Sequence, residues 1–186
     1  MWDQLSDISK KYQNLNGCHG YEHTERVVKI CLVLGEKLGA NMDVLIPAAI
    51  LHDIKRPELN HAVAGAIEAE KILRELSYNE DIINQIGKAI RVHSFSEAAE
   101  AETIEAKILS DADKLDAMGA TGIYRTANYS GEKDRPLNEF IKHFHEKLLT
   151  LRGLLYTDEA KEMAEERNKF MRDYLEQLSK ELKAET

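Results

Sequence analysis

Apolar residues recur every three or four positions along most of this 186-residue chain, and nowhere do they alternate with polar residues over a strand-like stretch. Spacing of this kind is typical of helices that bury one face. Only three prolines and ten glycines are available to interrupt the pattern. The chain is therefore predicted to be all-α.

Five helices are expected before the last third of the chain. The second of them is apolar on all sides, which indicates a buried helix, and it ends at His52-Asp53. Asp43 is positioned to cap this helix, with Pro47 tolerated near its start. Ser77 and Glu80 form a capping-box pattern before the fourth helix. The five segments cover about residues 21–38, 43–53, 61–76, 80–93 and 103–120.

The last third of the chain begins with a polar stretch, Gly119 to Pro136, which is predicted to be a long loop. Loops of this length in compact domains often serve as lids or binding segments. Two amphipathic helices are expected after it. The first carries Phe140, Phe144, Leu148, Leu151 and Leu155 on one face, and the second carries Met163, Phe170, Tyr174 and Leu178.

Charge and composition restrict the partners. A formal charge of −8 argues against broad attraction to a nucleic-acid polymer or an anionic membrane. No stretch approaches the roughly 20 apolar residues of a membrane helix, and the N-terminus lacks the pattern of a signal peptide. Cys18 and Cys31 form no CxxC pair. A cytoplasmic protein is expected.

Histidines are concentrated in the first half of the chain, at positions 19, 23, 52, 61 and 93. Several occupy positions where helical periodicity asks for an apolar side chain. A buried imidazole needs partners for both nitrogens, and several of them beside carboxylates are most simply satisfied by a shared cation. Mixed imidazole and carboxylate ligands suit Mn, Fe, Ni, Co or Zn. Such a metal activates water and neutralises phosphoryl charge, which predicts hydrolysis of a phosphoester or phosphoanhydride.

The order of these residues, together with the stretches around them, resembles the HD-domain superfamily of metal-dependent phosphohydrolases. The resemblance is closest to the small stand-alone bacterial and archaeal members, and it extends over nearly the whole chain. It implies a helical bundle forming a single HD domain over residues 1–186, with a core at about 20–120 and C-terminal helices at about 137–180 packed on it. The matching stretches are YEHTERV, AAILHDIKRP, IRVHSFS, KILSDADKLDAMGATGIYRT, RPLNEFIKHFHEKLLTLRGLL and AEERNKFM.

Carried over to this chain, the resemblance implies a particular set of site residues. The metal ligands are His23, His52, Asp53 and Asp113, while helical periodicity alone leaves Asp111 open in place of Asp113. Catalytic roles fall to Asp53, His93 and Asp113. His61 and His93 resemble the extra histidines of two-metal members, so the number of ions is one, or two if these residues complete a second site.

The substrate is expected to be a nucleotide or a related small phosphate. The resemblance suggests that Lys114 contacts its phosphate. Arg125 and Arg135 are candidate phosphate contacts because a guanidinium binds phosphate with two hydrogen bonds. Lys55 and Arg56 follow the HD pair, where they either attract phosphate or favour the C-terminal end of a helix.

Two other functions remain open from the sequence. A regulatory module could keep the metal site without catalysis, and a diiron redox enzyme would need His61 and His93 as additional ligands. The early aspartate of close relatives is missing beside His19, which leaves His19 as either a loop residue or a functional one. A homodimer is an open alternative to a monomer.

Overall fold

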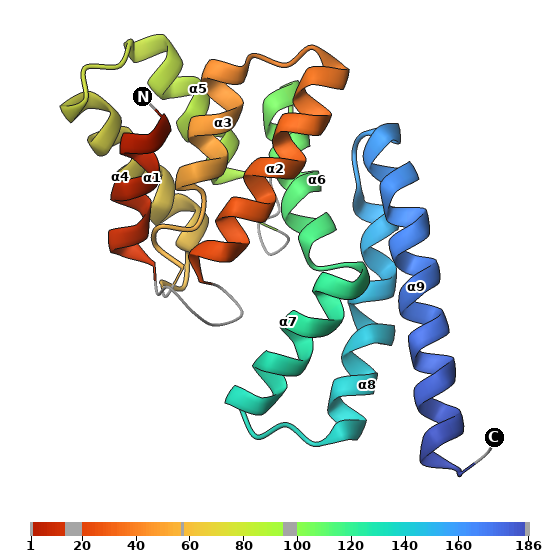
Figure 1. Ribbon diagram of the computed structural model, residues 1–186. Helices are drawn as coiled ribbons and strands as arrows, with labels where there is room; N and C mark the ends of the chain where they lie inside the picture. Colours follow the sequence, from red (N-terminus) through yellow and green to blue (C-terminus); the bar gives the residue numbers. More distant parts are fainter. Residues whose placement is uncertain (1, 14–19, 57, 95–99, 185–186) are drawn as a thin grey trace. The chain divides into compact units, whose positions relative to one another are not determined.

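The computed structural model describes residues 2–13, 20–56, 58–94 and 100–184, and these are helical almost throughout (Figure 1). No strand occurs in these ranges, so the all-α prediction is confirmed. The chain divides into two compact units, residues 1–113 and 114–186, with one helix running across the division. The elements are α1 (Trp2–Tyr12), α2 (Tyr21–Leu38), α3 (Met42–Leu51), α4 (His61–Glu75), α5 (Glu80–Arg91), α6 (Ile104–Asp116), α7 (Gly119–Glu132), α8 (Leu137–Glu146), the 3-10 helix η1 (Leu148–Leu154) and α9 (Asp158–Leu182).

Helix α3 is central to the first unit. It packs against α1, α2, α4 and α5, and every residue from Val44 to Leu51 is buried, as its apolar sequence predicts. Its start differs from the prediction, because the side chain of Asn41 accepts the cap hydrogen bond from Asp43 N at 3.0 Å. Pro47 therefore lies inside the helix, beyond the first turn.

Two other helices of the first unit differ from expectation. One has a different N-terminal cap, and the other was not expected at all. Helix α5 is capped by Asn79 rather than by a box of Ser77 and Glu80, and Ser77 instead has a φ of 58°. Helix α1 was not predicted. It is largely polar and is held to α3 by the buried Leu5 and by Ser9, whose hydroxyl donates to Ile50 O at 2.8 Å.

Small residues on α4 allow it to approach the end of α3. A Cβ added at Gly65 would lie 3.2 Å from the carbonyl oxygen of His52. Ala62, Ala66 and Ala69 are fully buried on the same helix. The close approach fixes the backbone from which His52 and Asp53 extend.

The second unit contains the largest error of the sequence-based prediction. The expected loop at Gly119 to Pro136 is mostly helix α7, which packs against α9. The buried positions of α7 are Gly119, Gly122, Thr126 and Ser130, which follow helical spacing but are small or polar. A helix with such a face lacks the apolar periodicity by which helices are recognised.

Helices α8 and α9 confirm two amphipathic segments but change their details. The apolar face from Phe140 to Leu155 is buried as predicted, although α8 ends at Glu146 and η1 continues it. On α9 the predicted face is wrong, since Phe170 is 53% exposed. The side chains that α9 buries are those of Ala160, Ala164, Asn168 and Met171.

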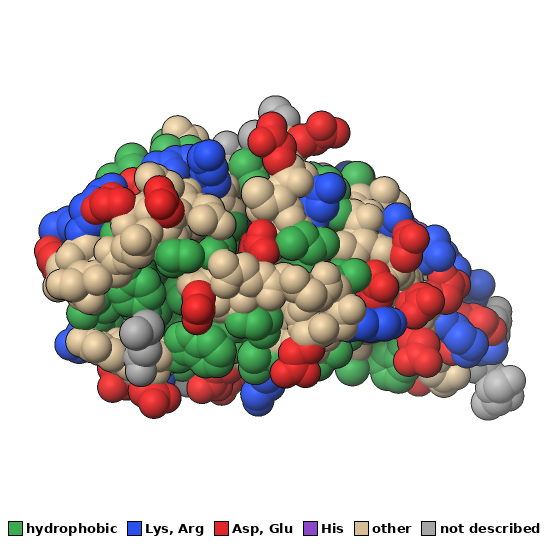
Figure 2. All heavy atoms as spheres, turned by 90° about the horizontal axis from the view of Figure 1, so that it is seen from above, with side chains coloured by type: hydrophobic (Ala, Val, Ile, Leu, Met, Phe, Trp, Pro, Cys, Tyr) green, Lys and Arg blue, Asp and Glu red, His purple; other side chains and the backbone are tan. Residues whose placement is uncertain are grey.

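The surface carries charged side chains of both signs, as expected for a chain with 25 basic and 33 acidic residues. Figure 2 shows acidic and basic side chains interspersed over the face in view, with hydrophobic side chains between them. Among the described helices, none combines the length and the hydropathy that crossing a bilayer requires.

Candidate metal centre

Five histidine and aspartate side chains lie together in the first unit, on two helices and on the segments that follow two others. His23 is in the first turn of α2, and His52 and Asp53 lie in the turn that follows α3. His93 follows α5, and Asp113 is on α6. The first four are buried, at 2% exposure or less, whereas the side chain of Asp113 is 21% exposed.

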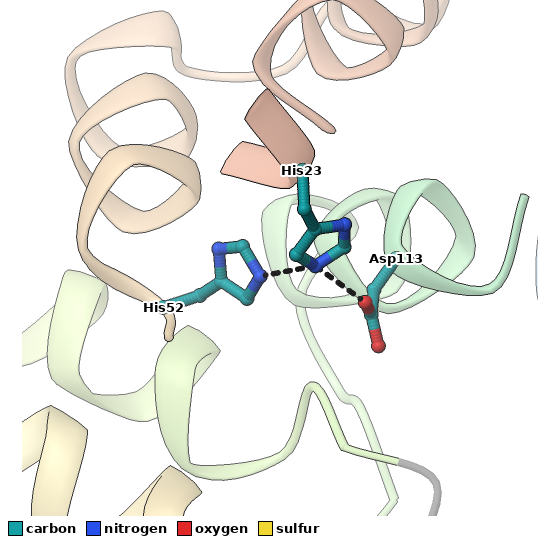
Figure 3. Close-up of side chains that lie close together, drawn as sticks. All are labelled: His23, His52 and Asp113. Atoms are coloured by element: carbon teal, nitrogen blue, oxygen red, sulfur yellow. Dashed lines mark hydrogen bonds and ion pairs between the residues drawn. The ribbon is translucent and has the colours of Figure 1, made fainter. Parts of the chain in front are cut away.

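The atoms that meet are ring nitrogens and carboxylate oxygens. His23 Nε2 lies 3.2 Å from Asp113 Oδ1 and 3.3 Å from His52 Nε2, as Figure 3 shows. Asp53 Oδ2 lies 3.7 Å from His23 Nε2 and 3.8 Å from His52 Nε2. Two groups of three therefore have all their ligand atoms within 4.8 Å of one another: His23, His52 and Asp113, and His52, Asp53 and His93.

Hydrogen bonds to the backbone fix the tautomers of two of these histidines. His52 Nδ1 lies 2.8 Å from Ala49 O, and His93 Nδ1 lies 2.6 Å from Ile90 O. A carbonyl oxygen only accepts, so each Nδ1 carries the proton. In the neutral ring Nε2 then keeps its lone pair, which is the form in which histidine binds a metal.

The buried charges of the cluster influence one another. Burial lowers the pKa of His52 to about 4, so this ring is neutral near pH 7. Burial opposes ionisation of Asp53, but the neighbouring His52, His93 and Arg56 hold the pKa of its carboxyl well below the usual range. Burial likewise opposes ionisation of Asp113, whose pKa is lowered by the hydrogen bond and charge of His23. Burial opposes protonation of His93, but the nearby carboxylates of Asp53 and Asp113 raise its pKa. The cluster thus combines a neutral His52 ring with two ionised carboxylates.

This arrangement fits a divalent metal. Donor atoms that share one ion at about 2.0–2.2 Å lie roughly 3.0–3.5 Å apart, which is close to the separations around His23 Nε2. Asp53 Oδ2 and His93 Nε2 are buried without a hydrogen-bond partner among the described residues. Such atoms are costly to bury unless something binds them.

The other carboxylate oxygen of Asp53 faces a different set of side chains. Asp53 Oδ1 lies 3.3 Å from Arg56 Nη1, 3.6 Å from His93 Nε2 and 3.9 Å from His61 Nε2. Arg56 Nη1 is also 3.0 Å from His61 Nε2. From the sequence, two roles were open for Arg56, and its position three residues after Asp53 could have indicated this contact.

The remaining predicted site residues lie in other surroundings. Lys55 Nζ is 3.6 Å from Glu58 and 3.9 Å from Glu68, which link it to its own turn and to α4. Asp111 is fully buried but belongs to neither group of meeting ligand atoms, and His19 lies outside the described residues.

Three predicted phosphate contacts belong to the second unit. Lys114 is buried, with Nζ 5.7 Å from the centre of the Tyr156 ring. Arg125 Nη1 lies 2.8 Å from Asp116 Oδ2, and the guanidinium of Arg135 lies 4.6 Å from the centre of the Tyr129 ring. Their roles toward a substrate stay predictions.

The chain is similar to known proteins over most of its length. The family model of the HD domain matches residues 20–118. The Bacillus subtilis protein YpgQ, described as uncharacterized, is 33% identical in an alignment of 173 residues, and the match covers 88% of this chain and 84% of YpgQ. The crystal structure of YpgQ in complex with ADP is similar with a TM-score of 0.83, at 30% identity and 97% coverage of both chains. An HD-superfamily hydrolase from Bacillus thuringiensis is similar with a TM-score of 0.80, at 32% identity, covering 99% of this chain and 97% of that one.

Proposed function

This chain belongs to the HD domain family, and from that membership we propose that it is a metal-dependent phosphohydrolase acting on a nucleotide. The observation that carries the proposal is the convergence of His23, His52, Asp53 and Asp113, beside two buried donor atoms that have no hydrogen-bond partner among the described residues. Such a set is suited to hold a divalent cation of the transition series.

We assign the four residues as the metal ligands. A divalent cation held by them would lower the pKa of bound water and neutralise charge on a phosphoryl group. The chain's own part is to keep the donors in place. The bonds from His52 to Ala49 O and from His93 to Ile90 O fix the two rings, and orientation of this kind raises metal affinity.

Asp113 and His93 are proposed to handle the proton and the water. Asp113 has the most exposed side chain of the cluster, so it lies where water can reach it, and we assign it as the acceptor of the proton from the attacking water. His93 is fully buried with Nε2 beside Asp53, and we assign it to orient that water.

A nucleotide is supported as the substrate by two observations. YpgQ, which is similar to this chain over 97% of its length, was crystallised in complex with ADP. The chain is also acidic overall, so an anionic substrate requires a local cation, which the proposed metal supplies.

Turnover of nucleotides by the manganese-loaded protein tests the proposal. Nucleoside mono-, di- and triphosphates and cyclic nucleotides are incubated with it, and released phosphate and pyrophosphate are measured. We expect hydrolysis of at least one class, and a loss of about 1000-fold or more in kcat/KM for His52→Ala because a ligand is removed.

His145→Ala is the matched control, because His145 is exposed on α8 and lies in the second unit. It should hydrolyse the same nucleotide at the wild-type rate. Absence of turnover across the whole panel, or equal turnover by His52→Ala and the wild type, would contradict the proposal.

A further inference from the structure

The carboxylate of Asp53 divides the buried cluster into two sides. Oδ2 faces His23 and His52, on the side that also contains Asp113. Oδ1 faces His61 and His93. By residue type alone, the two sides offer similar donors, because each has two imidazoles and one oxygen of the Asp53 carboxylate.

The two sides differ in charge. On the first side a second acid, Asp113, lies 3.2 Å from His23. On the second side the corresponding neighbour is the guanidinium of Arg56, 3.3 Å from Asp53 Oδ1 and 3.0 Å from His61 Nε2. The first side therefore carries negative charge to balance a divalent cation, whereas the second already contains a positive group.

Arg56 also occupies the lone pair of His61 Nε2, which a second metal ion would need. A guanidinium only donates hydrogen bonds, so Arg56 Nη1 donates and His61 Nε2 accepts. The proton of the neutral His61 ring is then on Nδ1. Consistent with this, neither of the two groups with meeting ligand atoms includes His61.

Local structure holds Arg56 in this position. Residues 52–56 form the turn after α3, and Arg56 N donates to Asp53 O at 3.1 Å. The turn brings the Arg56 side chain back over the carboxylate three residues earlier. This side chain is 34% exposed, so the position is open to solvent on one side.

We infer that Arg56 is a fixed cation in the place of a second metal ion, so that the centre binds a single ion. The inference rests on the metal centre of the proposed function. It also argues against a diiron redox site, which would need His61 and His93 as ligands to a second iron.

Metal content tests the inference without any substrate. The protein is stripped with chelator, reloaded with excess Mn²⁺ and desalted, and manganese per chain is measured by mass spectrometry. We expect about one ion per chain in the wild type and about two in Arg56→Gln, because the substitution removes the charge and frees His61 Nε2. Arg56→Lys keeps the charge and should retain about one.

Two controls make the result specific to this position. Arg74→Gln removes an exposed arginine that forms ion pairs with the partly buried Glu70 and the exposed Glu80, and it should leave the content at about one ion. Arg56→Gln combined with His61→Ala should also return to about one, because the second set of donors is then incomplete.

Electron paramagnetic resonance of the manganese-loaded wild type gives a second reading that needs no variant. An uncoupled manganese spectrum supports the inference, and a spin-coupled pair overturns it. Two ions in the wild type, or one ion in folded Arg56→Gln, also overturn it. If the wild type binds one ion but hydrolyses no nucleotide, the proposed function fails while this inference stands. If the wild type binds two ions and hydrolyses a nucleotide, this inference fails while the proposed function stands.

Discussion

Two aspartates are buried almost equally, one in each unit, but their surroundings differ. Asp116 is 1% exposed, and its Oδ2 lies 2.8 Å from the guanidinium of Arg125. Asp53 is 2% exposed, and its Oδ2 has histidine nitrogens at 3.7 and 3.8 Å but no hydrogen-bond partner among the described residues. Asp116 is satisfied by the protein itself, whereas Asp53 is arranged to bind something more.

Burial alone therefore does not distinguish a functional acid from a structural one. A buried carboxylate that is paired and hydrogen bonded contributes to the fold, and removing one partner leaves the other charge uncompensated. A buried carboxylate with an open oxygen and imidazole nitrogens close to it is suited to bind a cation. Each of the following changes tests one half of this contrast.

The largest stability effect is expected from Asp116→Ala. This substitution leaves the guanidinium of Arg125, which is only 12% exposed, without its carboxylate. We expect the free energy of unfolding to fall by about 3 kcal/mol, measured by urea denaturation, with the metal content of the folded protein unchanged.

Asp173→Ala is the matched control for that change. Asp173 pairs with Lys169 at 2.7 Å, but both side chains are exposed, so little stability should be lost. Loss of metal from folded Asp116→Ala would show that this acid contributes to the centre and would remove the contrast with Asp53.

A smaller effect is expected from Tyr78→Phe. The Tyr78 hydroxyl is also buried without a described partner, and burial raises its pKa, but it lies in the turn between α4 and α5 and belongs to neither ligand group. Removing a buried, unpaired hydroxyl should leave the free energy of unfolding unchanged or raise it by up to about 1 kcal/mol. A clear loss of stability or of metal binding would contradict this expectation, because it would show that the Tyr78 hydroxyl has a binding role although it lies outside the histidine and aspartate cluster.

The sequence predicted the helices that carry the centre better than the second unit. Helix α2 has the predicted bounds, and His52-Asp53 follows α3 as expected, because large apolar side chains mark the buried faces of these helices. Helix α7 was missed because it buries Gly122 and Thr126, and small residues on α9 such as Ala164 pack where large ones were expected. Close packing of small side chains leaves no hydrophobic pattern to read.

The candidate site was predicted in the same uneven way. The histidines that the structure brings together could be recognised from the sequence because polar residues are anomalous on apolar helix faces, whereas the aspartates were predicted from the family resemblance. Helical periodicity alone could not choose between Asp113 and Asp111, since that choice depends on the rotation of α6 relative to α2, and Asp113 was preferred on the family resemblance. Periodicity also could not place Arg56, whose direction depends on the turn after α3.

Calorimetric titration with Mn²⁺ of metal-stripped wild type and of Asp53→Asn tests the central claim most directly. The substitution keeps the shape of the side chain but removes the charge that both sides of the cluster share. Changes to groups behind the ligands already weaken metal binding by 10–100-fold, so loss of a ligand charge should weaken it by more than about 100-fold. We predict saturable binding of about one ion by the wild type and none measurable at the same concentrations by Asp53→Asn. Equal isotherms for the two proteins would contradict a metal centre at Asp53.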